Sequence, residues 1–530
     1  MRRILLAAST LALAAPAGAF ELTVLHINDF HSRIEPINKY DSTCSAEDDA
    51  AGVCFGGVAR LKTLLDARRD ALAAEGAPVL TLDAGDQFQG SLFYTTYKGE
   101  AAAEFMNAIG FDAMAVGNHE FDDGPGALAR FIDTVEVPVL SANTEIAAGT
   151  ELSGKVPGTM IVERGGERIG IVSVVAEDTA ETSSPGPSVT FAGAAETVRA
   201  AVAAFEAEGV TKVIALTHIG LPADIALAEA VSGIDLIVGG HSHTLLANAH
   251  DGALAPYPVM VESPDGAMTP IVQAYAYGKF LGEVTVTFDD AGNVVSAEGE
   301  PLLIDASVTP DPAIAARVAA LGAPIARMKT EVIGEAAAPI DGERTSCRAG
   351  ECAMGVLVTD AMLWESGADI AIQNGGGLRA SIDAGPVTMG EVLTVLPFQN
   401  TLATFRLSGA DVLAALENGV GQVEEGAGRF PQVGGMRYVW DPSAPAGSRI
   451  VWAAVATADG WAPLDPERMY AVVSNNFMRK GGDGYAMFRD NAENAYDYGP
   501  GLEDVTARFI AENSPYQPRT EGRVEIVQNQ

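Results

Sequence analysis

Short apolar runs alternate with longer stretches of helical spacing in the first half of the chain. Most of these runs are rich in Val, Leu and Ile, and each is followed within three residues by Asp, Asn or His. Because apolar strands that alternate with helices are typical of α/β proteins, this pattern predicts an α/β architecture. We expect strands over 22–27, 79–82, 113–116, 213–216 and 236–238, and helices over 57–72 and 194–207.

The pattern changes near residue 310. The segment 309–312 reads Thr-Pro-Asp-Pro, which offers an N-cap Asp311 followed by proline at the first helical position. Apolar residues then recur at helical spacing, although Pro324 should kink or split the helix. We interpret 310–330 as a helical connector and hinge between two domains. Its apolar positions are Ile314, Val318, Leu321, Ile325 and Met328.

The chain of 530 residues is too long for one hydrophobic core. We expect a first domain over 20–309 and a second over 331–527. The second domain also mixes strands with helices, so the predicted fold class is mixed α/β in both domains. Its clearest strands are expected over 370–373, 401–407 and 469–474, and its clearest helices over 354–364 and 409–418.

The first nineteen residues have the pattern of a secretory signal peptide. Two arginines precede an apolar run over 4–15, and Ala17 to Ala19 forms a small-residue cleavage site. We expect cleavage after Ala19 and a periplasmic or secreted mature protein with no stable membrane insertion. A retained anchor or a buried helix is the alternative.

Cysteine is rare, with four residues in the chain. An even number in an exported protein indicates two disulfides. Local pairing, Cys44 with Cys54 and Cys347 with Cys352, is the simplest of three connectivities. The spacing does not match a structural zinc site.

The formal net charge is −37, with 33 basic and 70 acidic side chains. This charge argues against a nucleic-acid polymer as partner, because such surfaces need clustered Lys and Arg. A phosphate-bearing substrate would require local cations, either metal ions or a few arginines. The simpler explanation of the acidity is solubility, or adaptation to a salty medium.

Histidine is also rare and unevenly placed. Five of the seven histidines follow predicted strands, within three residues of an Asp, Asn or Gly. We expect His26, inside a strand, to be a packing residue, and we assign no role to His250. The five histidines at strand ends are His31, His119, His218, His241 and His243.

Two cations that share a carboxylate bridge require mixed oxygen and nitrogen ligands. On an extended segment, Asp29 and His31 would point to one side, and so would His241 and His243. Asp86 follows a glycine-containing turn and is positioned to bridge the two cations. We therefore predict two divalent metal ions, with four protein ligands each. Asn118 and His218 complete the predicted set.

Four motifs carry a family resemblance. They read DFH at 29–31, GDQFQG at 85–90, GNHEFD at 117–122 and GGHSH at 239–243. They resemble the signature of the calcineurin-like metallophosphatases, and the stretch 82–122 is especially similar to the 5'-nucleotidases, both periplasmic bacterial and animal ecto-enzymes. The resemblance implies a four-layer αββα metallophosphatase domain followed by an α/β substrate-binding domain.

The resemblance also divides the ligands between the two metals. It implies one site formed by Asp29, His31, Asp86 and His243, and a second formed by Asp86, Asn118, His218 and His241. Some bacterial members have Gln at the position of His243, which leaves the metal identity open among Zn, Mn, Co and similar ions.

His119 and Asp122 are the predicted catalytic pair. A carboxylate three residues after a histidine accepts from the imidazole and favours its charged form. A charged His119 would stabilise negative charge that develops on the phosphoryl group. The family resemblance implies the same pair, and the alternative is that His119 is only a hydrogen-bond donor outside the reacting atoms.

The second domain contains the parts that a nucleotide needs. Aromatic rings stack on bases, carboxylates accept from ribose hydroxyls, and guanidinium groups bind phosphate. By resemblance to the C-terminal domain of the 5'-nucleotidases, Phe398 and Phe477 sandwich the base and Asp483 binds the ribose. Arg406 is a further candidate without a motif. The other predicted binding residues are Arg348, Asn374, Gly376, Arg379 and Asn400.

These observations predict an exported 5'-nucleotidase that hydrolyses nucleoside 5'-monophosphates to nucleoside and phosphate by attack of a metal-activated water. Nucleoside di- and triphosphates or UDP-sugars are further expected substrates. A 2',3'-cyclic-nucleotide phosphodiesterase with 3'-nucleotidase activity, or a thiosulfohydrolase of the same superfamily, is the alternative. A non-catalytic exported nucleotide-binding protein is the other class.

Overall fold

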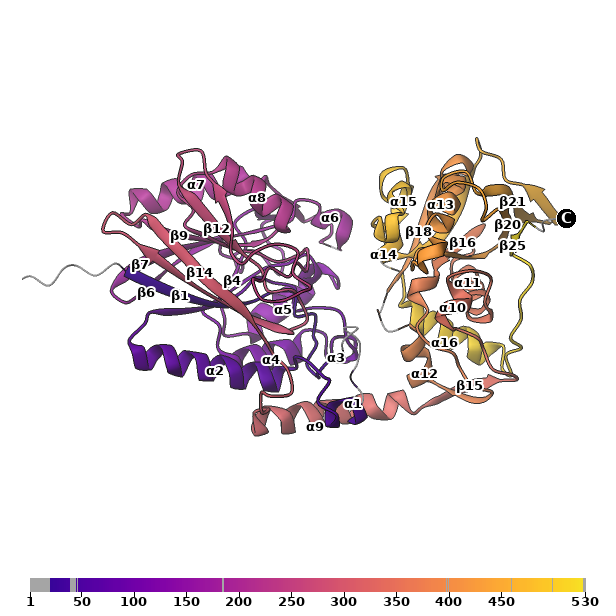
Figure 1. Ribbon diagram of the computed structural model, residues 1–530, viewed down its shortest axis with the longest axis horizontal. Coiled ribbons are helices and arrows are strands. Elements are labelled where there is room, and N and C mark those ends of the chain that lie inside the picture. The colour runs from indigo at the N-terminus through magenta and orange to yellow at the C-terminus, as the bar shows by residue number, and fades with distance from the viewer. Residues whose placement is uncertain are drawn as a thin grey trace, which may run out of the picture.

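The computed structural model describes residues 20–38, 44, 46–183, 185–396, 398, 400–458, 460–497 and 499–527. The predicted signal peptide, residues 1–19, lies outside the described residues. Figure 1 shows two domains that are joined along one side by a long helix, α9 (Pro312–Lys329).

The first domain is built on two six-stranded sheets. In the first sheet the order is β14-β13-β1-β2-β3-β4, and in the second it is β11-β12-β10-β9-β7-β6. Strand β1 is central in its sheet, where Val24 lies opposite Leu80 of the parallel β2 and Val284 of the antiparallel β13. The strands of the first sheet are β1 (Phe20–Ile27), β2 (Val79–Asp83), β3 (Ala113–Ala115), β4 (Val139–Leu140), β13 (Phe280–Phe288) and β14 (Val294–Leu303). Those of the second are β6 (Thr159–Arg164), β7 (Glu167–Val175), β9 (Lys212–His218), β10 (Leu236–Val238), β11 (Val259–Glu262) and β12 (Met268–Val272).

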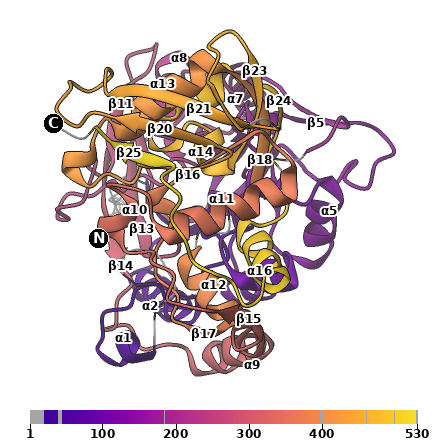
Figure 2. The same cartoon turned by 90° about the vertical axis from the view of Figure 1, so that its right-hand side faces the viewer.

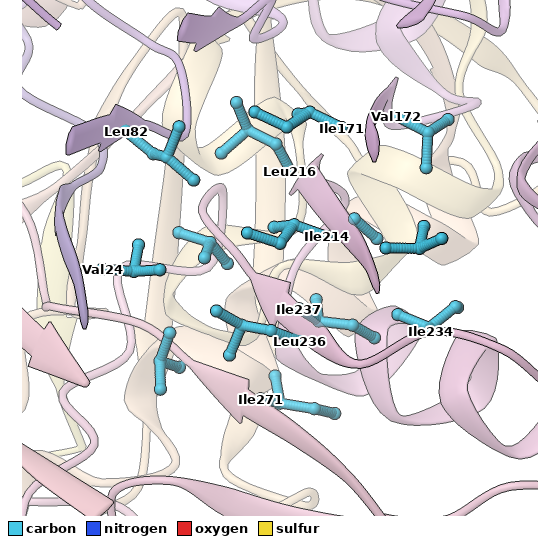
Figure 3. Close-up of a cluster of buried hydrophobic side chains, with 14 of the residues drawn as sticks. Val24, Leu82, Ile171, Val172, Ile214, Leu216, Ile234, Leu236, Ile237 and Ile271 are labelled. Carbon is cyan, nitrogen blue, oxygen red and sulfur yellow. The ribbon is translucent and has the colours of Figure 1, made fainter. Parts of the chain in front are cut away.

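The two sheets face each other across an aliphatic core, and helices cover their outer faces. Figure 3 shows part of this core, where Val24 and Leu82 of one sheet face Ile214 and Leu236 of the other. Apolar side chains of α2, α4 and α5 pack on the first sheet, and those of α7 and α8 pack on the second. The predicted four-layer αββα arrangement is therefore confirmed. The covering helices are α2 (Val58–Glu75), α4 (Glu100–Ile109), α5 (Pro125–Thr134), α7 (Ala194–Ala207) and α8 (Leu221–Ala230).

All five strands and both helices predicted for this domain are present, and β10 and α7 have the predicted bounds. The main difference is that β9 extends beyond the prediction to include His218. Smaller elements complete the domain: α1 (Ala46–Ala50), α3 (Leu92–Tyr97), α6 (Thr179–Thr182), a 3₁₀ turn at His119–Phe121, and a hairpin of β5 (Thr144–Ile146) with β8 (Val189–Phe191).

The second domain places a five-stranded sheet, in the order β19-β16-β23-β18-β24, between two apolar clusters. Helices α11 and α16 lie side by side on one face, as Figure 2 shows, and α13 and a four-stranded sheet, β22-β21-β20-β25, pack on the other. The strands are β15 (Val332–Ala336), β16 (Ile370–Asn374), β17 (Gly385–Thr388), β18 (Leu402–Ser408), β19 (Pro431–Gly434), β20 (Met436–Trp440), β21 (Ile450–Thr457), β22 (Gly460–Pro463), β23 (Met469–Asn475), β24 (Glu493–Tyr496) and β25 (Val524–Ile526). The helices are α10 (Arg344–Cys347), α11 (Ala353–Ser366), α12 (Met389–Val395), α13 (Gly409–Val420), α14 (Asn476–Arg479), α15 (Ala486–Asp490) and α16 (Leu502–Glu512).

The connector is one helix, so of the two expected effects of Pro324, a kink or a split, the split is wrong. Leu321 and Ile325 are buried against the first domain on either side of the proline. Because proline removes only one helical hydrogen bond, packing of the flanking turns is sufficient to keep the helix continuous. Helix α9 also contacts α12 of the second domain, so it touches both domains.

Both local disulfides are confirmed, since Cys44 is bonded to Cys54 and Cys347 to Cys352. His26 is fully buried within β1, where its Nε2 lies 2.8 Å from the hydroxyl of Tyr257, as expected of a packing residue. Among the described residues, no helix is both long and apolar enough to cross a membrane.

Candidate active site

The predicted metal ligands lie together at one edge of the two sheets of the first domain. Parallel strands β1, β2 and β3 of one sheet and β9 and β10 of the other end there. Because the carboxyl ends of parallel strands meet at the same edge, residues far apart in the sequence become neighbours. His241 and His243 are partly exposed, and the other five predicted ligands are buried: Asp29, His31, Asp86, Asn118 and His218.

One group of ligand atoms surrounds the side chain of His243. Its Nε2 atom lies 3.3 Å from Oδ1 of Asp29 and 3.0 Å from Nε2 of His31. Nε2 of His31 in turn lies 3.7 Å from Oδ2 of Asp86. Ligand atoms of this kind, packed within a few ångströms of a common point, are what a divalent cation requires.

A second group also includes Asp86, through the same oxygen, Oδ2. Oδ2 of Asp86 is 3.1 Å from Nε2 of His218, and Nδ1 of His241 is 2.8 Å from Oδ1 of Asn118. The Nε2 atom of His218 is buried and faces the carboxylates of Asp86 and Asp29, whereas its Nδ1 lies 2.6 Å from the carbonyl oxygen of Ala84. A histidine held at one nitrogen, with the other facing carboxylates, has the arrangement of a metal ligand. The donor set therefore fits divalent cations, with Asp86 common to both groups.

The backbone that presents these ligands differs from the prediction. Asp29, His31, His241 and His243 all have positive φ angles, between 50° and 76°. The expectation that each pair lies on an extended segment is therefore wrong. Strands β1 and β10 end before the ligands, and left-handed turns direct both side chains of each pair to the site. Such strained backbone is common at functional sites.

Glu120, which the sequence reasoning missed, anchors two of the ligand loops. Its buried carboxylate accepts hydrogen bonds from the backbone N–H groups of Asp86, Gln87, Phe88 and Gly117, at 2.7–3.1 Å. Burial raises the pKa of Glu120 to about 7 although these donors oppose the shift. Its position inside the GNHEFD motif was the available signal.

His119 and Asp122 are paired. Nδ1 of His119 lies 2.7 Å from Oδ2 of Asp122, which also accepts from Nε2 of Gln89, and Oδ1 accepts from the hydroxyl of Ser183. Burial lowers the pKa of His119, but the carboxylates of Asp122 and Asp86 raise it more strongly, to about 9. The imidazole is therefore a cation at neutral pH in this arrangement.

A cavity of about 630 Å³ lies between the domains, and it is lined by two of the seven predicted metal ligands and by all of the predicted nucleotide-binding residues. From the first domain it is lined by His31, His119 and His243, together with Arg33 and Tyr277, which sequence reasoning missed. All eight predicted nucleotide-binding residues line its other side: Arg348, Asn374, Gly376, Arg379, Phe398, Asn400, Phe477 and Asp483.

Local contacts fix several of these side chains. Nδ2 of Asn374 donates to Oδ2 of Asp483 at 2.7 Å, and the guanidinium of Arg379 lies 5.6 Å from the ring centre of Phe398. The rings of Phe398 and Phe477 are 46% and 45% exposed, and every other phenylalanine in the described part of the chain is buried or half-buried. Arg406 lies on β18 and does not line the cavity.

Comparison with known proteins agrees with this geometry. The calcineurin-like phosphoesterase family matches residues 22–245, and the C-terminal domain of 5'-nucleotidase matches residues 328–490. A 5'-nucleotidase from Diplobatis ommata is 37% identical over 549 aligned residues, which cover 99% of this chain and 92% of the relative. The chain belongs to the 5'-nucleotidase family.

Two further members of the family are similar over their whole length. A snake venom 5'-nucleotidase from Naja atra is 35% identical, covering 96% of this chain and 99% of the relative. The crystal structure of a 5'-nucleotidase precursor from Thermus thermophilus has 41% sequence identity and a TM-score of 0.69, covering 96% of this chain and 100% of the other. Like these members of the 5'-nucleotidase family, the chain is a hydrolase of the metallophosphatase type.

Proposed function

We propose that this chain is an exported, two-metal 5'-nucleotidase that hydrolyses nucleoside 5'-monophosphates to nucleoside and phosphate. One observation carries the proposal: a single interdomain cavity is lined by metal-type ligands on one side and by aromatic, carboxylate and guanidinium groups on the other. Only a substrate with both a phosphate and a flat, hydroxylated part uses both sides.

In this proposal, Asp86 is shared between two cations. Asp29, His31 and His243 would complete one site. The other would be completed by Asn118, His218 and His241. When bound, the two cations supply Lewis-acid charge and lower the pKa of water to make a nucleophile at neutral pH.

The protein groups then orient the nucleotide. Phe398 and Phe477 would hold the base between their rings, and Asp483, oriented by Asn374, would accept from the ribose hydroxyls. Arg348 and Arg379 would balance phosphate charge, with Gly376 and Asn400 lining the nucleoside end.

His119 would donate to a phosphoryl oxygen as charge develops there, and Asp122 keeps its imidazole oriented and charged. We propose 20–309 and 331–527 as the two domains. Because the substrate groups come from both, closure about the connector 310–330 would assemble the site.

Export is a second part of the proposal. The basic and apolar pattern of residues 1–19 supports a cleaved signal peptide, and both cysteine pairs are oxidised, as is typical outside the cytoplasm. The test is to sequence the amino terminus of the protein collected outside the cytoplasm. Phe20 is the expected first residue, and an uncleaved chain would contradict export by this route.

The activity is tested with a substrate panel on the purified mature protein. AMP should be hydrolysed with a higher kcat/KM than 2',3'-cyclic AMP or UDP-glucose, and Asp86→Asn should abolish phosphate release. Glu136→Gln, an exposed change in the same domain, serves as the control. Phosphate release that is equal in Asp86→Asn and the wild type would refute the two-metal site. A preference for 2',3'-cyclic AMP or UDP-glucose would refute nucleoside 5'-monophosphates as the substrate class.

A further inference from the structure

A second cavity, of about 320 Å³, shares His119, His243 and Lys480 with the nucleotide cleft and has six further lining residues of its own. The first domain lines it with groups of the proposed metal site and with Asp178. Among the described residues, the second domain lines it with three cations and no carboxylate. These three residues are Arg479, Lys480 and Arg489.

This concentration of positive charge is unusual in this chain. Lys and Arg make up 33 of 530 residues and are outnumbered two to one by Asp and Glu. A cavity with three basic residues among nine is therefore far from a random sample of the chain. A local cationic pocket within an acidic protein attracts anions at short range while the far field repels them.

We propose that this cavity is an anion subsite that binds a phosphate group next to the metal centre, with its cations supplied by the second domain. The inference rests on the proposed phosphohydrolase function. Two phosphate groups have the required chemistry. One is the inorganic phosphate that the reaction releases, and the other is the distal phosphoryl group of a nucleoside di- or triphosphate.

The three cations are held in different ways. Nη1 of Arg479 donates to the carbonyl oxygen of Phe488 at 3.1 Å, and its Nε lies 3.4 Å from Asp497, so this guanidinium is fixed. Lys480 lines the nucleotide cleft as well, and also a third interdomain cavity beside Asp122. It therefore lies where the three cavities meet at His119.

Arg489 is the more exposed of the two cations, Arg479 and Arg489, that line this cavity alone. It lines this cavity and neither of the other two that contain Lys480, and it forms an ion pair with Asp490, at 2.7 Å. Both side chains of this pair are more than half exposed. Because exposed ion pairs contribute little free energy, a phosphate group competes well with Asp490 for the guanidinium.

The position of the cations fits this role. Figure 1 shows α14 and α15 on the side of the second domain that faces the first, opposite α6. Asp178 directly precedes α6, and Arg489 lies within α15. The cations therefore complete the subsite only when the two domains are closed on each other, which couples phosphate binding to closure.

The test measures the inhibition constant of inorganic phosphate for AMP hydrolysis at fixed ionic strength. Arg489→Gln should raise this constant about fivefold, because one exposed charge is removed. Asp490→Asn should lower it, because the same guanidinium loses its competitor. Arg468→Gln is the matched control, since Arg468 is an exposed arginine of the same domain that packs on Tyr470.

The opposite directions separate binding from structure, because loss of a merely structural ion pair would make both variants alike. If both variants shift the constant in the same direction, or neither differs from Arg468→Gln, the subsite is refuted. Absence of AMP hydrolysis in the wild type would instead refute the proposed function.

A second arm identifies the source of the phosphate group. If the subsite holds the distal phosphoryl group, Arg489→Gln lowers kcat/KM for ADP several-fold more than for AMP. If it holds the released phosphate, the ratio of ADP to AMP activity is unchanged while the inhibition constant rises. Either result supports the subsite. If neither the inhibition constant of phosphate nor the ratio of ADP to AMP activity changes, the subsite is refuted.

Discussion

The carboxylate of Glu120 is expected to hold the metal-bridging loop in place. It accepts hydrogen bonds from four backbone N–H groups, two at each oxygen. Oε2 accepts from Asp86 and Gly117, and Oε1 accepts from Gln87 and Phe88. The side chain is fully buried, so no water replaces a lost acceptor. We predict that Glu120→Gln, which preserves shape but not acceptor number, destabilises the protein and weakens metal binding.

The magnitude follows from the number of acceptors. In the glutamine variant one oxygen becomes an amide nitrogen, so two buried N–H groups lose their acceptor whichever way the amide is turned. Each such group costs roughly 1–3 kcal/mol, which gives a total loss of roughly 2–6 kcal/mol. A freed ligand loop should lower metal affinity by about 10–100-fold, as for other groups that orient metal ligands.

The assay has two parts. Urea unfolding after chelation measures the loss of stability at pH 8. Burial raises the pKa of Glu120 to about 7, so the wild-type carboxylate is ionised at this pH. Competition with a chromophoric chelator then measures metal affinity. Glu136→Gln, an exposed control, should change stability by less than about 0.5 kcal/mol. A Glu120→Gln protein as stable as this control, with unchanged metal affinity, would refute the anchoring role.

Three further predictions concern other parts of the chain. Burial raises the pKa of Asp235 to about 7, so between pH 4 and 7 the folded chain binds more protons than the unfolded chain, and the unfolding free energy falls as pH rises. Urea unfolding at pH 5 and pH 8 should show a smaller fall in unfolding free energy for Asp235→Asn than for the wild type, and an equal fall in the two proteins would contradict this. Replacing Cys347 and Cys352 together by serine should lower the unfolding free energy by about 2 kcal/mol, because the disulfide no longer restricts the unfolded chain. The KM for AMP should also rise, since Arg348 lies within the ring that the disulfide closes, and an unchanged melting temperature and KM would exclude a role of the disulfide in stability and binding. Phe477→Ala should raise the KM for AMP about tenfold with little change in kcat, and unchanged KM would show that the ring does not stack on the base.

Much of the first domain could be predicted because its signals are local. The strand 236–238 and the helix 194–207 have the predicted bounds, since apolar runs and alanine-rich helical spacing are properties of short segments. Rare residues helped in the same way, because histidines concentrated at strand ends must gather when parallel strands share an edge.

Other features depend on tertiary contacts and could not be read from short segments. The left-handed backbone at Asp29 and His243 results from how the strand ends turn into the site, and the continuous helix through Pro324 depends on packing against the first domain. Glu120 was missed because its role lies in accepting from backbone groups of a distant loop. The cationic cavity around Arg489 exists only where two domains meet.

In the proposed active site, Asp86 joins two cations at the edge of the sheets. The most direct test of this arrangement is the metal content of purified active protein, measured by elemental analysis after removal of loosely bound ions, for the wild type and Asp86→Asn. We expect about two divalent ions per wild-type chain and a lower metal content in Asp86→Asn. Active wild-type protein with only trace metal, or equal metal content in the two proteins, would contradict this arrangement.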